Sequence, residues 1–139
     1  MHDRWVRSYN VWNDPYYSTP ASYRYRRDGR WYSVNQYGVD ILNQAIRYGY
    51  EAGARAGQAD RMDGWRPDWR GNYAYMDANY GYHGWHVDQR EYNHYFREGF
   101  RRGYEDAYHG RSRYGRRSNG EWVILASVLE AIFGVQRHY

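Results

Sequence analysis

Two long stretches of the chain repeat their apolar residues with a helical period. In residues 39–62 and again in residues 89–109, small or aromatic side chains share one face and charged side chains share the other. This pattern is typical of an amphipathic helix. Asp40 and Asp88 stand where the N-caps would be, and a glycine follows each stretch within a few residues. The sequence therefore predicts two helices with these bounds.

A third stretch, residues 119–133, is apolar on almost every side of a helical cylinder. Ser118 and Glu121 have the spacing of a capping box, which is typical of a helix N-terminus, and Gly134 follows the last apolar residue. The sequence predicts a third helix here, buried against the rest of the fold or against a partner.

Residues 22–34 predict a β-hairpin. Asp28 and Gly29 supply the left-handed backbone that a type I′ turn needs. This turn places Tyr25 opposite Tyr32 on one face of the hairpin. Because an isolated hairpin is only marginally stable, its tyrosine face is expected to dock on another part of the protein.

The predicted elements combine into a mainly α fold. It consists of an antiparallel, glycine-faced helical hairpin, an apolar C-terminal helix, and an N-terminal β-hairpin with an extended arm. Residues 1–21 are rich in Trp and Tyr without a helical period, which favours an extended or irregular arm. We expect two units, the arm and β-hairpin in residues 1–38 and a helical domain in residues 39–139.

Small residues recur at every fourth position in both long helices. A glycine inside a helix costs about 1 kcal/mol relative to alanine, so the repeat indicates that another helix approaches closely. Rings such as Phe96 and Phe100 are expected to fill the grooves that the glycines leave. A shift that aligns Gly49 with Gly99 also suggests a weak internal duplication. The predicted helix-packing residues are Gly49, Gly53, Gly57, Gly99, Gly103 and Ala107.

Composition narrows the classes of function. The chain has 139 residues, a net charge of +4, 21% aromatic residues and no cysteine, which excludes disulfides and thiolate zinc sites. All 20 basic residues are arginine, whose planar guanidinium stacks on rings and binds carboxylates through two bonds. The longest apolar run, residues 122–135, is shorter than the ~20 residues that span a bilayer. The N-terminus lacks the apolar stretch of a signal peptide, so either the chain is not secreted or a leader has been removed.

The number of aromatic residues exceeds what one small core must bury. Trp, Tyr and Arg are enriched at interface hot spots, and exposed apolar surface marks interaction sites. The sequence therefore predicts a non-enzymatic structural protein that self-associates into an oligomer or filament. The residues expected at that contact are Trp5, Trp12, Tyr16, Tyr17, Tyr23, Tyr25, Trp31, Tyr32, Trp122, Leu125, Leu129, Ile132 and Phe133.

A second hypothesis is binding to RNA or single-stranded DNA. Two segments interleave arginine with rings, and stacking combined with phosphate contacts is how single strands are held. No recognised nucleic-acid-binding motif accompanies them. The arginines concerned are Arg24, Arg26, Arg27, Arg30, Arg111, Arg113, Arg116 and Arg117.

Catalytic and metal-binding chemistry is only weakly indicated. His83, His86 and His94 lie close together in the sequence and are weak candidates for a metal site. The acidic residues at the helix ends have arginine neighbours, so ion pairs explain them without catalysis. No nucleophile, phosphate-binding or dinucleotide-binding motif occurs. We expect no enzyme activity, no cofactor and no small-molecule substrate.

Several segments carry a resemblance to known proteins, among them Asn35-Gln-Tyr-Gly-Val-Asp40, Gly49-Tyr-Glu-Ala-Gly53 and Phe96-Arg-Glu-Gly-Phe-Arg-Arg-Gly-Tyr-Glu-Asp106. By these segments the chain resembles a group of small, uncharacterised bacterial proteins that are rich in Tyr, Gly and Arg and are often encoded with a leader peptide. The resemblance covers roughly residues 35–135 and carries no motif diagnostic of chemistry. It implies a bacterial protein of the cell envelope or extracellular space, or a cytoplasmic one if no leader was removed. It implies no activity.

Overall fold

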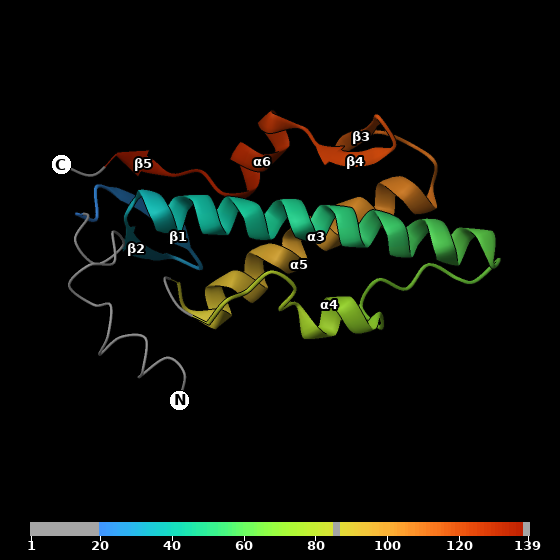
Figure 1. Cartoon of the computed structure of the whole chain (residues 1–139), viewed down its shortest axis with the longest axis horizontal. Helices are drawn as coiled ribbons and strands as arrows, with labels where there is room; N and C mark the ends of the chain where they lie inside the picture. Colours follow the sequence, from blue (N-terminus) through green and yellow to red (C-terminus); the bar gives the residue numbers. More distant parts are fainter. Residues whose placement is uncertain (1–19, 85–86, 138–139) are drawn as a thin grey trace.

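The computed structural model describes residues 20–84 and 87–137 (Figure 1). Helix predominates in this part of the chain, but two small antiparallel sheets accompany it. The fold is therefore mixed, and it agrees with the mainly α prediction only in part. In chain order the elements are β1 (Tyr23–Arg27), β2 (Arg30–Val34), α3 (Gln36–Met62), α4 (Tyr73–Asp77), α5 (Gln89–Tyr108), β3 (Gly115–Ser118), β4 (Glu121–Ile124), α6 (Ala126–Ile132) and β5 (Gln136–Arg137).

The two long helices, α3 and α5, run parallel and not antiparallel (Figure 1). Along their contact, Gly49 faces Phe96, and one turn later Gly53 faces Phe100. Contacts that advance in the same direction on both helices require parallel axes. The predicted helical hairpin is therefore wrong. The connection between the helices, residues 63–88, is long enough to return the chain to the start of α3, so nothing forces an antiparallel arrangement.

The glycines of α3 let the backbone of α5 approach directly. A Cβ atom at Gly49 would lie 2.0 Å from the carbonyl oxygen of Phe96, and one at Gly53 would lie 2.0 Å from that of Phe100. No side chain fits in such a space, because real Cβ contacts are never this short. The grooves are thus filled by backbone, and the expectation that the rings of Phe96 and Phe100 fill them is wrong.

The glycines of α5 make equivalent contacts with α3. A Cβ atom at Gly99 would lie 2.1 Å from the carbonyl oxygen of Ile46, and one at Gly103 would lie 2.0 Å from that of Tyr50. The shift in numbering that relates Gly49 to Gly99 also relates Phe96 to Ile46. The helix pair therefore has an approximate twofold symmetry, which agrees with the internal duplication suggested by the sequence.

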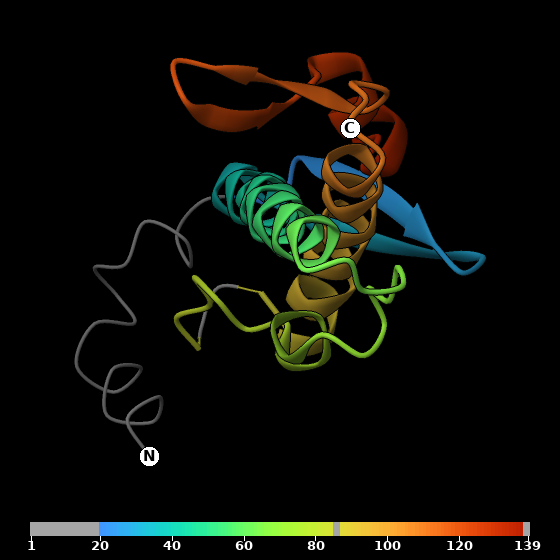
Figure 2. The ribbon, with the colours of Figure 1, turned by 90° about the vertical axis from the view of Figure 1, so that its right-hand side faces the viewer.

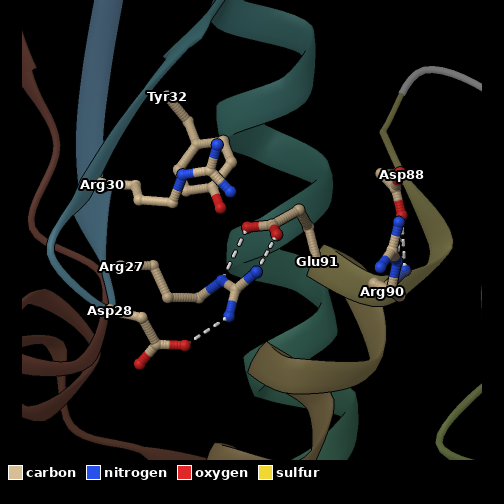
Figure 3. Close-up of a pocket in the computed structure, with 7 residues that line it drawn as sticks. All are labelled: Arg27, Asp28, Arg30, Tyr32, Asp88, Arg90 and Glu91. Carbon is tan, nitrogen blue, oxygen red and sulfur yellow. Dashed lines mark hydrogen bonds and ion pairs between the residues drawn. The ribbon is translucent and has the colours of Figure 1, made fainter.

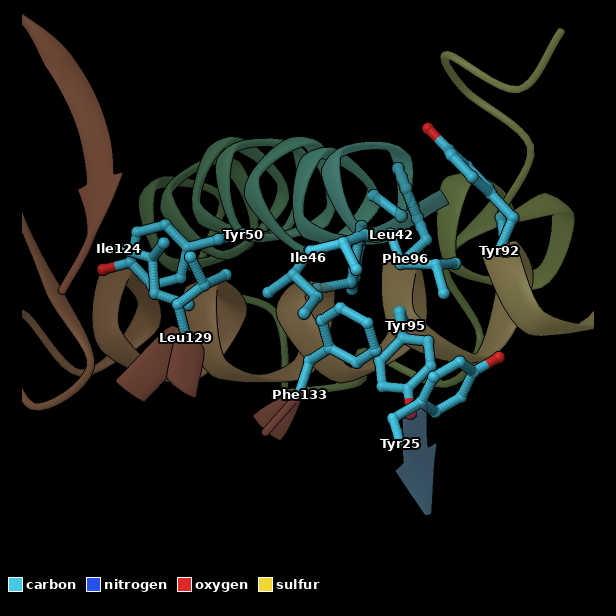
Figure 4. Packing of buried hydrophobic residues seen from close by; sticks show 14 of the residues in the cluster. Tyr25, Leu42, Ile46, Tyr50, Tyr92, Tyr95, Phe96, Ile124, Leu129 and Phe133 are labelled. Carbon is cyan, nitrogen blue, oxygen red and sulfur yellow. The ribbon is translucent and has the colours of Figure 1, made fainter. Parts of the chain in front are cut away.

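Two layers cover the helix pair (Figures 1 and 2). The C-terminal segment, with β3, β4, α6 and β5, lies across one side, and the connection that carries α4 lies across the other. Figure 4 shows the core under the C-terminal segment, where Phe133 contacts both Tyr25 and Tyr95 with ring centroids 5.0 Å apart. Farther along α3, Ile124 and Leu129 gather around Tyr50.

The β1–β2 hairpin has the predicted register. Tyr25 pairs with Tyr32, and the turn residues Asp28 and Gly29 have φ angles of 52° and 80°. Strand β5 extends this sheet in the order β2-β1-β5. Since Tyr25 is buried in the common core, the hairpin is part of the helical body. The boundary predicted at residue 38 falls inside α3 and is wrong.

The predicted third helix is wrong over its first half. Residues Gly115–Ser118 and Glu121–Ile124 pair as an antiparallel hairpin, β3–β4, and only Ala126–Ile132 is helical. Asn119 and Gly120 have φ angles of 53° and 81°, the left-handed backbone of a tight hairpin turn. The same residues fit a capping box, which would start a helix, and an Asn-Gly turn, which joins two strands. The pairing of β3 with β4 shows that they form the turn.

The helix starts are set by side chains that accept backbone N–H groups. Asp88 accepts from the N–H of Arg90, so the predicted cap of α5 is confirmed. Asn35 accepts from the N–H of Gly38 and caps α3. The predicted cap Asp40 lies within the first turns of this helix instead.

Candidate interaction surface

The β1–β2 hairpin is held in place by one acidic residue of α5. Glu91 is 8% exposed and accepts a hydrogen bond from the Tyr25 hydroxyl at 2.9 Å. The guanidinium of Arg27 donates to both of its carboxylate oxygens, from Nε at 3.0 Å and also from Nη2. A two-bond ion pair of this kind sets orientation as well as distance, so it fixes how the hairpin lies on α5.

Burial and the contact with Glu91 also set the protonation of its partners. Burial, followed by the hydrogen bond to Glu91, raises the pKa of Tyr25. The hydrogen bond to Glu91 raises the pKa of Arg27. The phenol therefore stays a neutral donor and the guanidinium stays a cation over the whole neutral range.

An open hollow of about 550 Å³ lies beside this ion pair (Figure 3). Arg90 is almost fully exposed and lies 4.0 Å from Asp88, too far for a strong bond. Arg30 pairs with Arg27 in the strand ladder, but its guanidinium makes no hydrogen bond or ion pair with residues 20–84 and 87–137. The lining contains the guanidinium groups of Arg27, Arg30 and Arg90 and an equal number of carboxylates. The hollow therefore has no excess charge to attract a polyanion. Its lining residues are Arg27, Asp28, Arg30, Tyr32, Asp88, Arg90 and Glu91.

The outer face of the hairpin carries an exposed tryptophan between two arginines. The guanidinium of Arg24 lies 4.3 Å from the ring centroid of Trp31, and that of Arg26 lies 5.6 Å from it. Trp31 remains 46% exposed. These cation–π contacts cover part of the Trp31 ring, and the rest of its surface faces solvent.

Strand β2 forms one edge of its sheet. It pairs with β1 only, and within the described residues no strand lies on its other side. Its sequence, Arg30-Trp-Tyr-Ser-Val34, is rich in strand-forming residues and contains no proline. An edge of this kind presents free backbone N–H and C=O groups to a partner strand.

The second hairpin, β3–β4, is anchored by another buried acid of α5. Asp106 is fully buried and accepts a hydrogen bond from the Tyr50 hydroxyl at 2.9 Å. It also accepts from the backbone N–H groups of Arg113, Tyr114 and Gly115, at distances of 3.0, 2.8 and 3.0 Å. Burial, followed by the bond to Asp106, raises the pKa of Tyr50. Four donors thus compensate one buried carboxylate.

The sequence offers both acids other roles. Glu91 has the spacing of a capping-box residue, and Asp106 stands among arginines at a helix end. The structure instead turns each carboxylate inward, where each meets a buried tyrosine and fixes a hairpin. The only sequence signal for the burial of these two carboxylates was their common position on one side of α5.

The residues predicted to self-associate have different environments. Buried side chains cannot contact a partner, so the assignments of Tyr25, Leu129 and Phe133 to a surface contact are wrong. Trp31 is exposed, whereas the half-buried residues are Tyr23, Tyr32, Trp122, Leu125 and Ile132. Trp5, Trp12, Tyr16 and Tyr17 lie outside the described residues.

The arginines predicted to bind nucleic acid do not form one surface. Arg24, Arg26, Arg27 and Arg30 belong to the β1–β2 hairpin, and the others belong to β3–β4 and the segment before it. The two hairpins lie apart along the long axis (Figure 1). Several of these cations are engaged within the protein. Besides the pair with Glu91, Arg117 donates to the carbonyl of Gly120 and covers the Trp122 ring, and Arg113 covers the Tyr114 ring.

The histidines lie in unrelated settings. His94 is half-buried and packs edge-on against Tyr95, and burial lowers its pKa. His83 borders a small hollow near Tyr92, and His86 lies outside the described residues. Across residues 20–84 and 87–137 no three potential metal ligands come together.

The same part of the chain contains no helix with the length and apolar character needed to cross a bilayer. Comparisons with family models, with curated proteins and with solved structures found no match. The resemblance to the Tyr/Gly/Arg-rich bacterial proteins therefore stays a prediction, and the function is inferred from the geometry alone.

Proposed function

We propose that the protein is a non-enzymatic structural subunit that self-associates by pairing strand β2 with β2 of a second copy. The supporting observation is the open edge of β2, which carries the exposed ring of Trp31 on a hairpin fixed by Glu91. A rigid edge loses little conformational freedom on binding. Joining two copies would extend each three-stranded sheet into a continuous six-stranded one.

The sequence of β2 is compatible with antiparallel pairing to itself. With Tyr32 at the centre, Trp31 would lie opposite Ser33 of the partner subunit, and Arg30 would lie opposite Val34 of the partner subunit. No like charges meet in this register, which matters because directly opposed like charges are destabilising. A twofold contact of this kind uses the same strand on both subunits.

Sedimentation velocity over a range of protein concentrations tests the proposal. We expect the wild type to exceed the 16.9 kDa mass of one chain and to dissociate on dilution. In the Trp31→Glu variant a carboxylate replaces the ring opposite Arg26, so the hairpin keeps a favourable cross-strand pair. The same carboxylate places a charge on the proposed contact surface and should prevent two copies from pairing. This variant is expected to remain a folded monomer.

Tyr37→Glu is the matched control. Tyr37 is 43% exposed but belongs to α3 and not to the strand edge. This variant should associate like the wild type. A monomeric wild type at every concentration would exclude self-association, and unchanged association of Trp31→Glu would exclude the β2 edge as its site.

Single-stranded nucleic acid is the second candidate partner, because the exposed ring and flanking arginines of the same face also suit base stacking and phosphate contacts. Titration with a labelled oligonucleotide at several salt concentrations distinguishes the two. Binding that weakens steeply with salt and is lost in Arg24→Gln would support it. Absence of binding at low salt would exclude it.

A further inference from the structure

A second hollow lies where the chain leaves α3 and enters α4, far from the β1–β2 hairpin (Figure 1). Its volume is about 380 Å³. It combines two aromatic rings with carboxylate, amide and guanidinium groups, a mixture typical of small-molecule sites. The lining residues are Asp60, Trp65, Arg66, Asp68, Gly71, Asn72 and Tyr73.

The two rings are free to contact a ligand. Trp65 is 63% exposed and Tyr73 is 77% exposed. Many tyrosines and tryptophans among the described residues contact another ring or a guanidinium, as Trp69 does. Within residues 20–84 and 87–137, Trp65 and Tyr73 contact neither a ring nor a guanidinium. Large rings left open to water on one face indicate a binding surface.

The loop that carries these rings is held by hydroxyl groups of α5. The Tyr108 hydroxyl donates to the carbonyl of Trp65 at 2.6 Å. The Tyr104 hydroxyl donates to a carboxylate oxygen of Asp60 and accepts from the N–H of Asp68 at 2.9 Å. Burial, followed by the bond to Asp60, raises the pKa of Tyr104 to about 12, so the hydroxyl keeps its proton. The hollow is therefore formed before any ligand arrives, which lowers the cost of binding.

Charge restricts the class of ligand. Asp60 and Asp68 contribute two carboxylates to the hollow, against one guanidinium from Arg66. The excess of negative charge disfavours phosphate and acidic sugars. One oxygen of Asp68 accepts the N–H of Gly71, which leaves its second oxygen able to accept a ligand hydroxyl. The free carboxylate oxygens, the amide of Asn72 and the guanidinium suit a neutral molecule rich in hydroxyl groups.

We infer that this hollow binds a neutral pyranose sugar. The C–H face of a pyranose ring packs on the electron-rich face of an aromatic ring, here Trp65 or Tyr73. Its hydroxyl groups lie at the rim of the ring, where Asp60, Asp68 and Arg66 would bond them. This site is separate from the β2 edge and does not depend on self-association.

Isothermal titration with cellohexaose and with chitotetraose, two neutral β-linked chains, tests the inference on the full-length protein. We expect saturable binding of at least one of them. Trp65→Ala and Tyr73→Ala should each weaken it by about tenfold. Tyr37→Ala removes an exposed ring of α3 that lies outside both the hollow and the β2 edge, and it should leave the affinity unchanged.

Circular dichroism controls for folding, since the loop is held through the backbone of Trp65 and not through its exposed ring. Absence of binding to both sugars would overturn the inference. Binding that neither Trp65→Ala nor Tyr73→Ala weakens would also overturn it, as would preference for an oligothymidylate or an oligogalacturonate over the neutral chains. A monomeric protein that still binds sugar would separate this site from the proposed assembly.

Discussion

The carbonyl oxygen of Phe100 occupies the space where Gly53 lacks a side chain, 2.0 Å from the position that a Cβ atom would take. This relationship sets the distance between α3 and α5. We expect Gly53→Ala to lower the free energy of unfolding by about 2 kcal/mol or more, because the backbone of Phe100 has no room to shift alone. The intrinsic gain of about 1 kcal/mol for alanine in a helix is too small to offset this loss.

Urea denaturation followed by circular dichroism measures this effect. Gly57→Ala should be milder, since its Cβ atom would lie 2.5 Å from the carbonyl oxygen of Tyr104. Arg55→Ala on the exposed face of the same helix should change stability by no more than about 0.5 kcal/mol. Equal stability of Gly53→Ala and the wild type would mean that the helices are not in direct contact there.

Asp106→Asn should loosen the β3–β4 hairpin. The asparagine side chain has the same size, but its NH2 group is a donor. In the wild type the backbone N–H groups of Tyr114 and Gly115 donate to a carboxylate oxygen at that position. We expect a loss of about 2–3 kcal/mol in the free energy of unfolding and faster amide exchange at Tyr114 and Gly115. Asp63→Asn, at an exposed position, serves as the control. Unaltered exchange in Asp106→Asn would show that the carboxylate does not anchor the hairpin.

Glu91→Gln should detach the β1–β2 hairpin while leaving the helix pair in place. The substitution removes a mostly buried ion pair and leaves the guanidinium of Arg27 only the exposed carboxylate of Asp28 as a counter-charge, at a cost of about 3 kcal/mol. Limited proteolysis should then cut within residues 23–34. The exposed pair of Glu51 and Arg55 provides the comparison, because Glu51→Gln should cost only about 0.5 kcal/mol. Resistance of the hairpin to protease in Glu91→Gln would contradict the prediction.

His94 should make the protein less stable in mild acid. Burial, aided by the charge of Arg27, lowers its pKa below the ordinary value of 6.5, although Glu98 opposes the shift. The unfolded chain therefore takes up a proton before the folded chain does, and stability falls as the pH drops below about 6.5. In His94→Gln the slope of stability between about pH 7 and pH 5.5 should be smaller. An identical slope in both proteins would exclude His94 as its source.

Buried tyrosines should limit stability in alkali. Burial raises the pKa values of Tyr25, Tyr50, Tyr92 and Tyr95 above the ordinary 10.0. Above that pH the unfolded chain releases protons that the folded chain retains, so stability decreases as the pH rises. The phenolate absorbance of these residues should appear together with the loss of helical circular dichroism. Their ionisation in a fully helical protein would contradict this prediction.

Local pattern was sufficient for the elements whose signals concern neighbouring residues. The period of residues 39–62 and 89–109 predicts α3 and α5, and Asp28-Gly29 predicts the β1–β2 turn with its register. Local pattern failed at residues 119–133, because Ser118 to Glu121 satisfies the rules for a helix cap and also those for a hairpin turn. Only the pairing of β4 with β3 distinguishes them, and pairing is not a local property.

The sequence by itself determined that small residues line one face of each long helix, because the cost of helical glycine requires a close neighbour. Only the tertiary structure decided that the helices run parallel, that backbone and not side chains fills the glycine grooves, and that Glu91 and Asp106 turn inward. The reason is physical. Periodicity shows which face of an element is buried, whereas the direction of the partner and the pairing of a buried carboxylate depend on residues brought together from distant parts of the chain.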